Sequence, residues 1–165
     1  MPPRRVAPGH FSPDTRAFIE LLGRHDVRYV IAGGEAVIFH GHARLTGDVD
    51  FFFDRAERNP AKLFAALEEF WGGEVPGLRS MDELRQPGLV LQYGVPPNRI
   101  DLINDIDGVS FDEAWAGRED AVMAADDGEV MLPFIGRAEL IRNKEASGRP
   151  KDLDDLAYLR DRPRL

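Results

Sequence analysis

The fold is decided by two stretches of the sequence, VIAGGEA at 30–36 and DVDFFF at 48–53. The β-branched and aromatic run from Val27 to Ala32 predicts a buried strand, and the two glycines behind it predict a tight turn. The second stretch predicts another strand with an unusual polar start. Side chains alternate between the two faces of a strand, so every second residue from Val49 onward is expected to face a core.

Helices and strands alternate outward from these two stretches. A helix is expected from Pro13 to about residues 23–25, because Ser12 can cap it and proline suits its first position. The other helices are expected at 35–40, 59–71, 110–116, 137–146 and from 150 onward. The other strands are expected at 89–95, 98–103, 121–124 and 129–132. This order predicts an α+β (mixed α/β) domain with a small mixed sheet, flanking helices and a helical C-terminal segment.

The chain is expected to divide into three parts. Residues 1–12 contain three prolines and predict a mobile N-terminal tail. Residues 13–132 form the core, and residues 133–165 form helices packed on it. In the last helix the residues expected to point inward are Leu153, Leu156, Ala157 and Leu159. Its acids are expected to form a solvated helix start: Asp152, Asp154 and Asp155.

The composition is that of a folded globular chain. The chain has 165 residues, 43% of them hydrophobic and 30% charged, with a net charge of −8 and no cysteine. Without cysteine, disulfides, thiolate metal sites and a cysteine nucleophile are excluded. No apolar run is long enough to cross a bilayer, so we expect a cytoplasmic protein without a membrane partner. The acidic balance argues against tight, nonspecific binding of nucleic acid.

Two carboxylates open the strand at 48–53. Asp48 and Asp50 share one face, roughly 6.5–7 Å apart at their Cα atoms. Such a pair repels and loses hydration, which a cation between the two acids relieves. Oxygen-only ligands suit Mg²⁺ or Mn²⁺. Strand ends also carry aspartate simply as a turn residue, so the pair alone is weak evidence.

Two further features indicate a functional site only when they are taken together with these acids. Gly33 and Gly34 let the backbone approach a phosphate closely, although an ordinary strand-to-helix turn explains them more simply. Asp101 interrupts the apolar strand RIDLI at 99–103, where it is either a solvent-facing edge residue or a third acid. If this strand lies beside 48–53, three carboxylates can hold two divalent ions and align an in-line phosphoryl or nucleotidyl transfer.

The combined pattern resembles the DNA polymerase β-like nucleotidyltransferase superfamily. Gly33-Gly34, thirteen residues, Asp48-Val49-Asp50 and the later Asp101 match its core motif. The sequence of residues 31–50 is similar to that of proteins in the small bacterial and archaeal branch. This branch includes minimal nucleotidyltransferases and abortive-infection toxins of toxin–antitoxin pairs. NKEASGRPKD at 143–152, followed by Asp155, resembles a C-terminal segment of the same branch. The resemblance spans roughly residues 15–160, with 13–132 as the nucleotidyltransferase-like core.

The resemblance implies a role for each matched residue. Asp48, Asp50 and Asp101 would bind the metals, and Asp101 would also help to deprotonate the attacking hydroxyl. The residues that would hold the nucleotide or face its phosphates are Gly33, Gly34, Arg44, Thr46, Lys144, Arg149 and Lys151. Lys144 and Lys151 could instead lie on a solvated helix surface, paired with acids such as Asp155.

The implied function is metal-dependent transfer of NMP from an NTP, such as ATP, with Mg²⁺ or Mn²⁺ as cofactor. The acceptor would be a hydroxyl or phosphate of RNA or tRNA, a protein or a small molecule, and a toxin would have an antitoxin partner. The alternative is a catalytically inactive nucleotide- or metal-binding module that acts as a partner subunit or homodimer. Glu35 bears on this choice. Its carboxylate either points away from the triphosphate, pairs with Arg44, or marks a site that no longer binds nucleotides.

Overall fold

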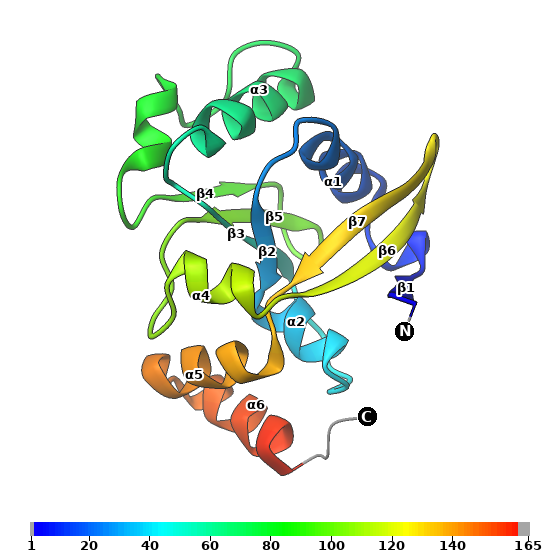
Figure 1. Ribbon diagram of the computed structural model, residues 1–165, viewed down its shortest axis with the longest axis vertical. Coiled ribbons are helices and arrows are strands. Elements are labelled where there is room, and N and C mark those ends of the chain that lie inside the picture. Colours follow the sequence, from blue (N-terminus) through cyan, green and yellow to red (C-terminus); the bar gives the residue numbers. More distant parts are fainter. Residues whose placement is uncertain (1, 162–165) are drawn as a thin grey trace.

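Within residues 2–161, which this computed structural model describes, seven strands form one mixed sheet (Figure 1). Residue 1 and residues 162–165, which belong to the expected tail and C-terminal segment, lie outside the described residues. The strands are β1 (Arg4–Val6), β2 (Tyr29–Ala32), β3 (Asp48–Phe53), β4 (Val90–Tyr93), β5 (Arg99–Ile103), β6 (Glu119–Ala125) and β7 (Gly128–Phe134). Their order across the sheet is β1-β6-β7-β2-β3-β5-β4.

Helices surround this sheet and confirm the predicted α+β class. The α-helices are α1 (Pro13–Arg24), α2 (Gly33–Phe39), α3 (Asn59–Trp71), α4 (Phe111–Ala116), α5 (Arg137–Ser147) and α6 (Pro150–Asp161). Two 3-10 turns accompany them, η1 (Pro8–His10) and η2 (Met81–Arg85). The predicted start of α1 is confirmed, because the Ser12 hydroxyl accepts a hydrogen bond from the Thr15 amide. In the described part of the chain, none of the helices has the length and apolar character needed to cross a membrane.

The inner strand β3 is buried on both of its faces along its phenylalanine run. Phe51 packs edge-on against Phe18 of α1, which in turn contacts Phe70 of α3. Phe52 points to the opposite face, where its ring meets Phe111 of α4 at 5.3 Å. The phenylalanine run therefore fixes β3 between two layers of helices, and the acids at its start are carried by a rigid strand.

The neighbours of β3 decide where the acids and the glycine turn lie. β3 pairs in parallel with β5, in a register that sets Asp50 opposite Asp101. On its other side β3 pairs antiparallel with β2, with Asp50 opposite Ala32. Gly33 follows Ala32 directly, so the first turn of α2 begins beside Asp50. The expected neighbourhood of the strands at 48–53 and 98–103 is confirmed.

The expectation of a mobile tail is wrong for residues 4–10. Arg4 to Val6 pair in parallel with β6, and residues 8–10 form a helical turn. The Arg4 guanidinium donates to the Phe39 carbonyl at 2.7 Å and lies over the Phe39 ring, while Arg5 pairs with Glu129. The arginines therefore hold the segment against an otherwise open sheet edge instead of keeping it in water.

The last helix turns a different face inward than its leucines predict. Leu153 is 56% exposed and Ala157 is also exposed, whereas Leu156 and Leu159 are buried as expected. The helix instead buries Asp152 and Asp155, which corrects the expectation of a solvated start.

A buried network of charges explains this orientation. The Lys144 ammonium of α5 lies 2.9 Å from an Asp152 oxygen and 3.1 Å from an Asp155 oxygen, and it is only 3% exposed. Arg44, in the loop before β3, pairs with Asp155 at 3.0 Å. Burial raises the pKa of Asp152, but hydrogen bonds from Lys144, Arg149 and Ser147 outweigh it and hold the pKa well below its usual range. The network ties the C-terminal helices to the loop that leads into the acids.

Replacing Lys144 tests the structural importance of this network. Lys144→Met removes the buried cation that Asp152 and Asp155 share, and leaves each of them one arginine that is more exposed than Lys144. We therefore expect the free energy of unfolding to fall by about 3–5 kcal/mol in urea titrations. Arg160→Met, which removes a surface pair with Glu145 at 3.0 Å, is the control and should cost less than about 1 kcal/mol. Equal losses for the two variants would contradict the assignment.

Candidate functional site

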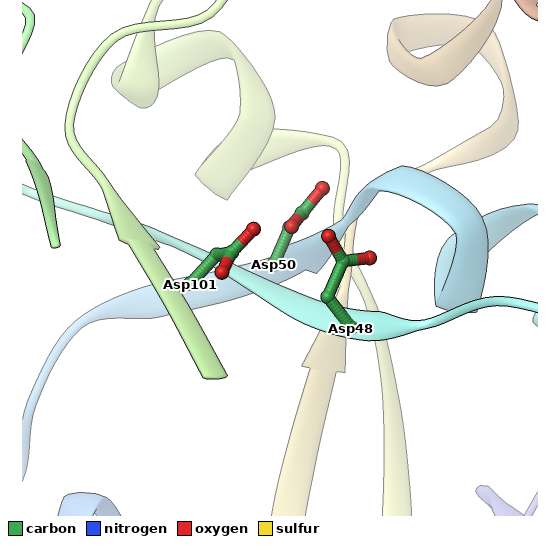
Figure 2. A group of neighbouring side chains, drawn as sticks. All are labelled: Asp48, Asp50 and Asp101. Atoms are coloured by element: carbon green, nitrogen blue, oxygen red, sulfur yellow. The ribbon is translucent and has the colours of Figure 1, made fainter. Parts of the chain in front are cut away.

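Three carboxylates from two adjacent strands converge at one point of the sheet (Figure 2). Asp48 and Asp50 project from β3 and Asp101 from β5, and one carboxylate oxygen of each lies within 4.8 Å of the others. Asp101 is buried, and the other two are half-buried. The structure thus brings together the three acids that the sequence singled out.

The cluster is electrostatically strained. Burial raises the pKa of Asp50 to about 7, with further contributions from the charges of Asp48 and Asp101. Burial also raises the pKa of Asp101, and although the hydrogen bond from Arg99 lowers it, the balance remains upward. Such a cluster is stable with a shared proton or with a cation near it.

Arg99 belongs to this site, although the sequence reasoning gave it no role. Its guanidinium donates to Asp48 at 2.7 Å and to the two oxygens of Asp101 at 2.9 and 3.1 Å. It stands two residues before Asp101 on β5, so both side chains share one face. The spacing Arg-x-Asp on a strand was the signal that could have found it. The two contacted acids are thereby bridged, while no ion pair to Asp50 is found within residues 2–161.

The glycine turn lies against the acids. Gly33 has a φ of +61°, and a Cβ on it would come 2.1 Å from an Asp50 carboxylate oxygen. A Cβ on Gly34 would come 2.6 Å from the Thr46 hydroxyl oxygen and 3.1 Å from a nitrogen of Arg44. A side chain at either position would therefore force Asp50 or Thr46 to move, and the positive φ of Gly33 favours glycine as well.

The loop before β3 supports the acids from the other side. The Thr46 hydroxyl lies 3.3 Å from the backbone carbonyl of Asp48 and 3.3 Å from its carboxylate, so it can donate to either. The half-buried guanidinium of Arg44 forms an ion pair with Asp155. These two residues hold the loop in place next to the glycine turn.

The three C-terminal cations differ in their availability. Lys144 is enclosed by Asp152 and Asp155, so the alternative pairing with Asp155 is confirmed, although the lysine is buried and not on a solvated surface. Lys151 is exposed, and its charge lowers the pKa of Asp50. Arg149 hydrogen-bonds Asp152 at 2.8 Å, and the charge of Asp50 helps to raise its pKa. Lys151 and Arg149 thus lie within electrostatic range of the cluster.

Glu35 is paired within the domain. Its carboxylate lies 2.6 Å from the Nε2 atom of His10 and is buried. Of the three explanations left open by the sequence, pairing with Arg44 is therefore wrong, because the partner is the histidine of η1. The segment before α1 thus supplies the group that compensates Glu35.

The donor set of the cluster fits a divalent cation. Its ligands are carboxylate oxygens alone, which suit Mg²⁺ or Mn²⁺ better than softer metals. Burial, and after it the charges of Asp48 and Asp101, raise the pKa of Asp50 and disfavour a third negative charge at this point. A cation between the acids would relieve the repulsion.

Comparisons with known proteins add no assignment. A scan against models of known protein families finds no match for the chain. A search of curated proteins finds none either. The acids, glycines and cations of the site must therefore carry the functional argument by themselves.

Substitution of Gly33 tests the close approach. Gly33→Ala should destabilise the protein by on the order of 1–2 kcal/mol more than Gly72→Ala, measured by urea unfolding. Gly72 is the matched control because its φ is similarly positive, +70°, but nothing lies within 4 Å of an added Cβ. Both variants share the backbone cost, so equal losses would mean that Asp50 does not crowd the turn.

The raised pKa of Asp50 predicts a pH dependence of stability in chelating buffer. Unfolded aspartate loses its proton near pH ~4, whereas folded Asp50 keeps it to about pH 7. The stabilisation from this proton is present at low pH, and it is lost as the pH rises through that window. In Asp50→Asn the free energy of unfolding should fall less over this pH window than in the natural protein. The difference should be on the order of 1–3 kcal/mol, after allowance for solvent screening. An unchanged pH profile of the unfolding free energy in the variant would contradict the assignment.

Proposed function

We propose that the protein is a metal-dependent nucleotidyltransferase, which transfers NMP from an NTP to a hydroxyl or phosphate acceptor and releases pyrophosphate. One observation carries the proposal: three carboxylates of β3 and β5 meet directly beside a turn in which a Cβ at Gly33 would collide with Asp50. An acid cluster supports metal binding in general. The adjoining glycine turn adds a place where backbone amides can approach a phosphate chain.

Asp48, Asp50 and Asp101 are the residues that would hold Mg²⁺ or Mn²⁺. The bound metal would neutralise charge that develops on the transferred phosphoryl group and on the leaving pyrophosphate. The chain itself supplies further positive charge from Lys151 and Arg149, whose fields reach Asp50. Gly33 and Gly34 would lie along the triphosphate, with Thr46 and Arg44 fixing the loop opposite them.

The transfer itself requires one proton acceptor. The acceptor oxygen forms a bond to the α-phosphorus while the bond from that phosphorus to the bridging oxygen of the β-phosphate breaks. The hydroxyl proton passes to Asp101, and the bonding electrons leave with pyrophosphate. Burial and the charge of Asp48 raise the pKa of Asp101, which makes it a better proton acceptor than an ordinary aspartate.

A second candidate function is a catalytically inactive module that binds a nucleotide or a metal and acts as a partner subunit or homodimer. Arg99 favours it, because its guanidinium already bridges Asp48 and Asp101 at hydrogen-bond distance. A cluster whose negative charge is partly neutralised by Arg99 needs less positive charge from a metal ion. The enzyme requires Arg99 to move aside, whereas the module does not.

The acceptor class and the biological setting are part of the proposal. Acceptors in the family that the sequence resembles include tRNA ends, proteins and small molecules. The net charge of −8 disfavours bulk RNA as the acceptor. A toxin role in the cytoplasm would add an antitoxin partner, and it rests on the sequence resemblance alone.

Label transfer tests the enzyme directly. The protein is incubated with each α-labelled NTP, Mg²⁺ and cell lysate, and labelled products are separated by size and by nuclease or protease treatment. We expect label on one acceptor class, and its loss in Asp101→Ala. Asp105→Ala, an exposed acid shortly after β5, is the matched control and should retain activity. Absence of transfer with all four nucleotides would favour the inactive module.

Thermal unfolding separates the two candidates from a third outcome, no ligand site at all. Mn²⁺ with NTP should raise the melting temperature of the natural protein and of Asp105→Ala, because a ligand stabilises the state that it binds. Asp48→Ala should show no rise. A rise without label transfer indicates the binding module, and no rise in any variant contradicts both candidates.

A further inference from the structure

The guanidinium of Arg99 is held by the clustered acids alone. Its Nε atom donates to one oxygen of Asp101 at 2.9 Å. One of its terminal nitrogens donates to the other oxygen of Asp101 at 3.1 Å and to Asp48 at 2.7 Å. Within residues 2–161 these two carboxylates are its only ion-pair partners. The position of this cation therefore depends on the same acids that would hold a metal.

Arg99 lies at an open part of the sheet. Its side chain is 29% exposed, and Asn98 before it is exposed as well. Gly94, across the turn between β4 and β5, carries no side chain, and a Cβ there would lie 3.9 Å from the Cα of Arg99. The side chain can therefore rotate toward water about its own bonds, without a change in the strand.

The other cations close to the site are fixed more firmly. Lys144 is 3% exposed and contacts two buried carboxylates of α6. Arg44 pairs with Asp155, which is only 2% exposed. The departure of either cation would remove charge compensation from a buried acid, which is costly. A metal that displaces Arg99 brings its own positive charge to the acids that the arginine leaves.

Arg99 and a divalent metal compete for Asp48 and Asp101. Two cations a few ångströms apart repel each other, and partial burial limits the screening of this repulsion by water. The guanidinium already engages both oxygens of Asp101. Asp50 has no ion pair within residues 2–161, so it is the acid that an incoming metal meets without a competitor.

We propose that Arg99 is a resident counter-ion that a divalent metal must displace, and that it thereby sets the metal affinity of the site. Before a metal binds, the guanidinium holds Asp48 and Asp101 together against their mutual repulsion. On metal binding it gives up these hydrogen bonds and turns toward water beside Gly94. The inference rests on the proposed function, because the same carboxylates would hold the metal.

Calorimetric titration of the full-length protein with Mn²⁺, without nucleotide, tests this competition. Arg99→Gln should bind Mn²⁺ about 10–100-fold more tightly than the natural protein, because charge-assisted hydrogen bonds no longer have to be given up. Arg99→Lys keeps the positive charge but loses the forked geometry that engages two carboxylates at once. Its affinity should lie between those of the natural protein and Arg99→Gln.

Arg118→Gln is the matched control. Arg118 also stands two residues before an aspartate, and it donates to Asp120 at 3.1 Å. Its side chain is 28% exposed, against 29% for Arg99. Asp120 lies on β6, which β7 and β2 separate from β3. This variant makes the same change in charge away from the acid cluster, so its affinity for Mn²⁺ should equal that of the natural protein.

Thermal unfolding distinguishes a displaced counter-ion from an arginine with a structural role alone. In chelating buffer Arg99→Gln should unfold at a lower temperature than the natural protein, because Asp48 and Asp101 lose their counter-charge. Saturating Mn²⁺ should remove this difference, since a ligand stabilises the state that it binds. A difference that persists at saturating Mn²⁺ would mean that Arg99 only supports the fold.

The outcomes separate this inference from the proposed function. If Arg99→Gln binds Mn²⁺ no more tightly than the natural protein, Arg99 does not set the affinity, while the metal site and the proposed function stand. If neither protein binds Mn²⁺ at millimolar concentrations, the metal site itself is wrong, and both proposals fail with it.

Discussion

The parallel pairing of β3 with β5 is the constraint on which the site depends. Its register sets Asp50 directly opposite Asp101, and strand alternation adds Asp48 on the same face. Like charges at this spacing repel, and partial burial leaves too little water to screen them. Phe51 and Phe52 prevent the strand from moving to relieve the repulsion, because each is buried in a different layer.

Two clusters of charge in the domain show different designs. Around Lys144 the chain itself compensates the carboxylates, because Asp152 and Asp155 are each in direct contact with two cations. Around Asp50 they are unbalanced, since Arg99 bridges two acids and the third keeps a raised pKa. The stabilisation of the fold is a sufficient explanation for a balanced buried network. An unbalanced one packed against the turn at Gly33 is typical of a binding site.

The sequence predicted local features well, and it predicted a long-range contact only for Asp101 beside β3. Alternation and capping located β3, the start of α1 and the shared face of Asp48 and Asp50, because these depend on neighbours in the chain. The role of Arg99 and the burial of Asp152 were missed, since each depends on partners from another strand or helix. A charged residue at a helix start reads as solvated unless the counter-charge, here Lys144, is known to lie against it.

Anomalous diffraction from crystals grown with Mn²⁺ shows whether the three carboxylates hold a metal. We expect a manganese peak coordinated by oxygens of Asp48, Asp50 and Asp101, with the Arg99 guanidinium moved away from at least one of its two carboxylates. Crystals with no peak at this position, and with Arg99 still bridging the acids at saturating Mn²⁺, would contradict it.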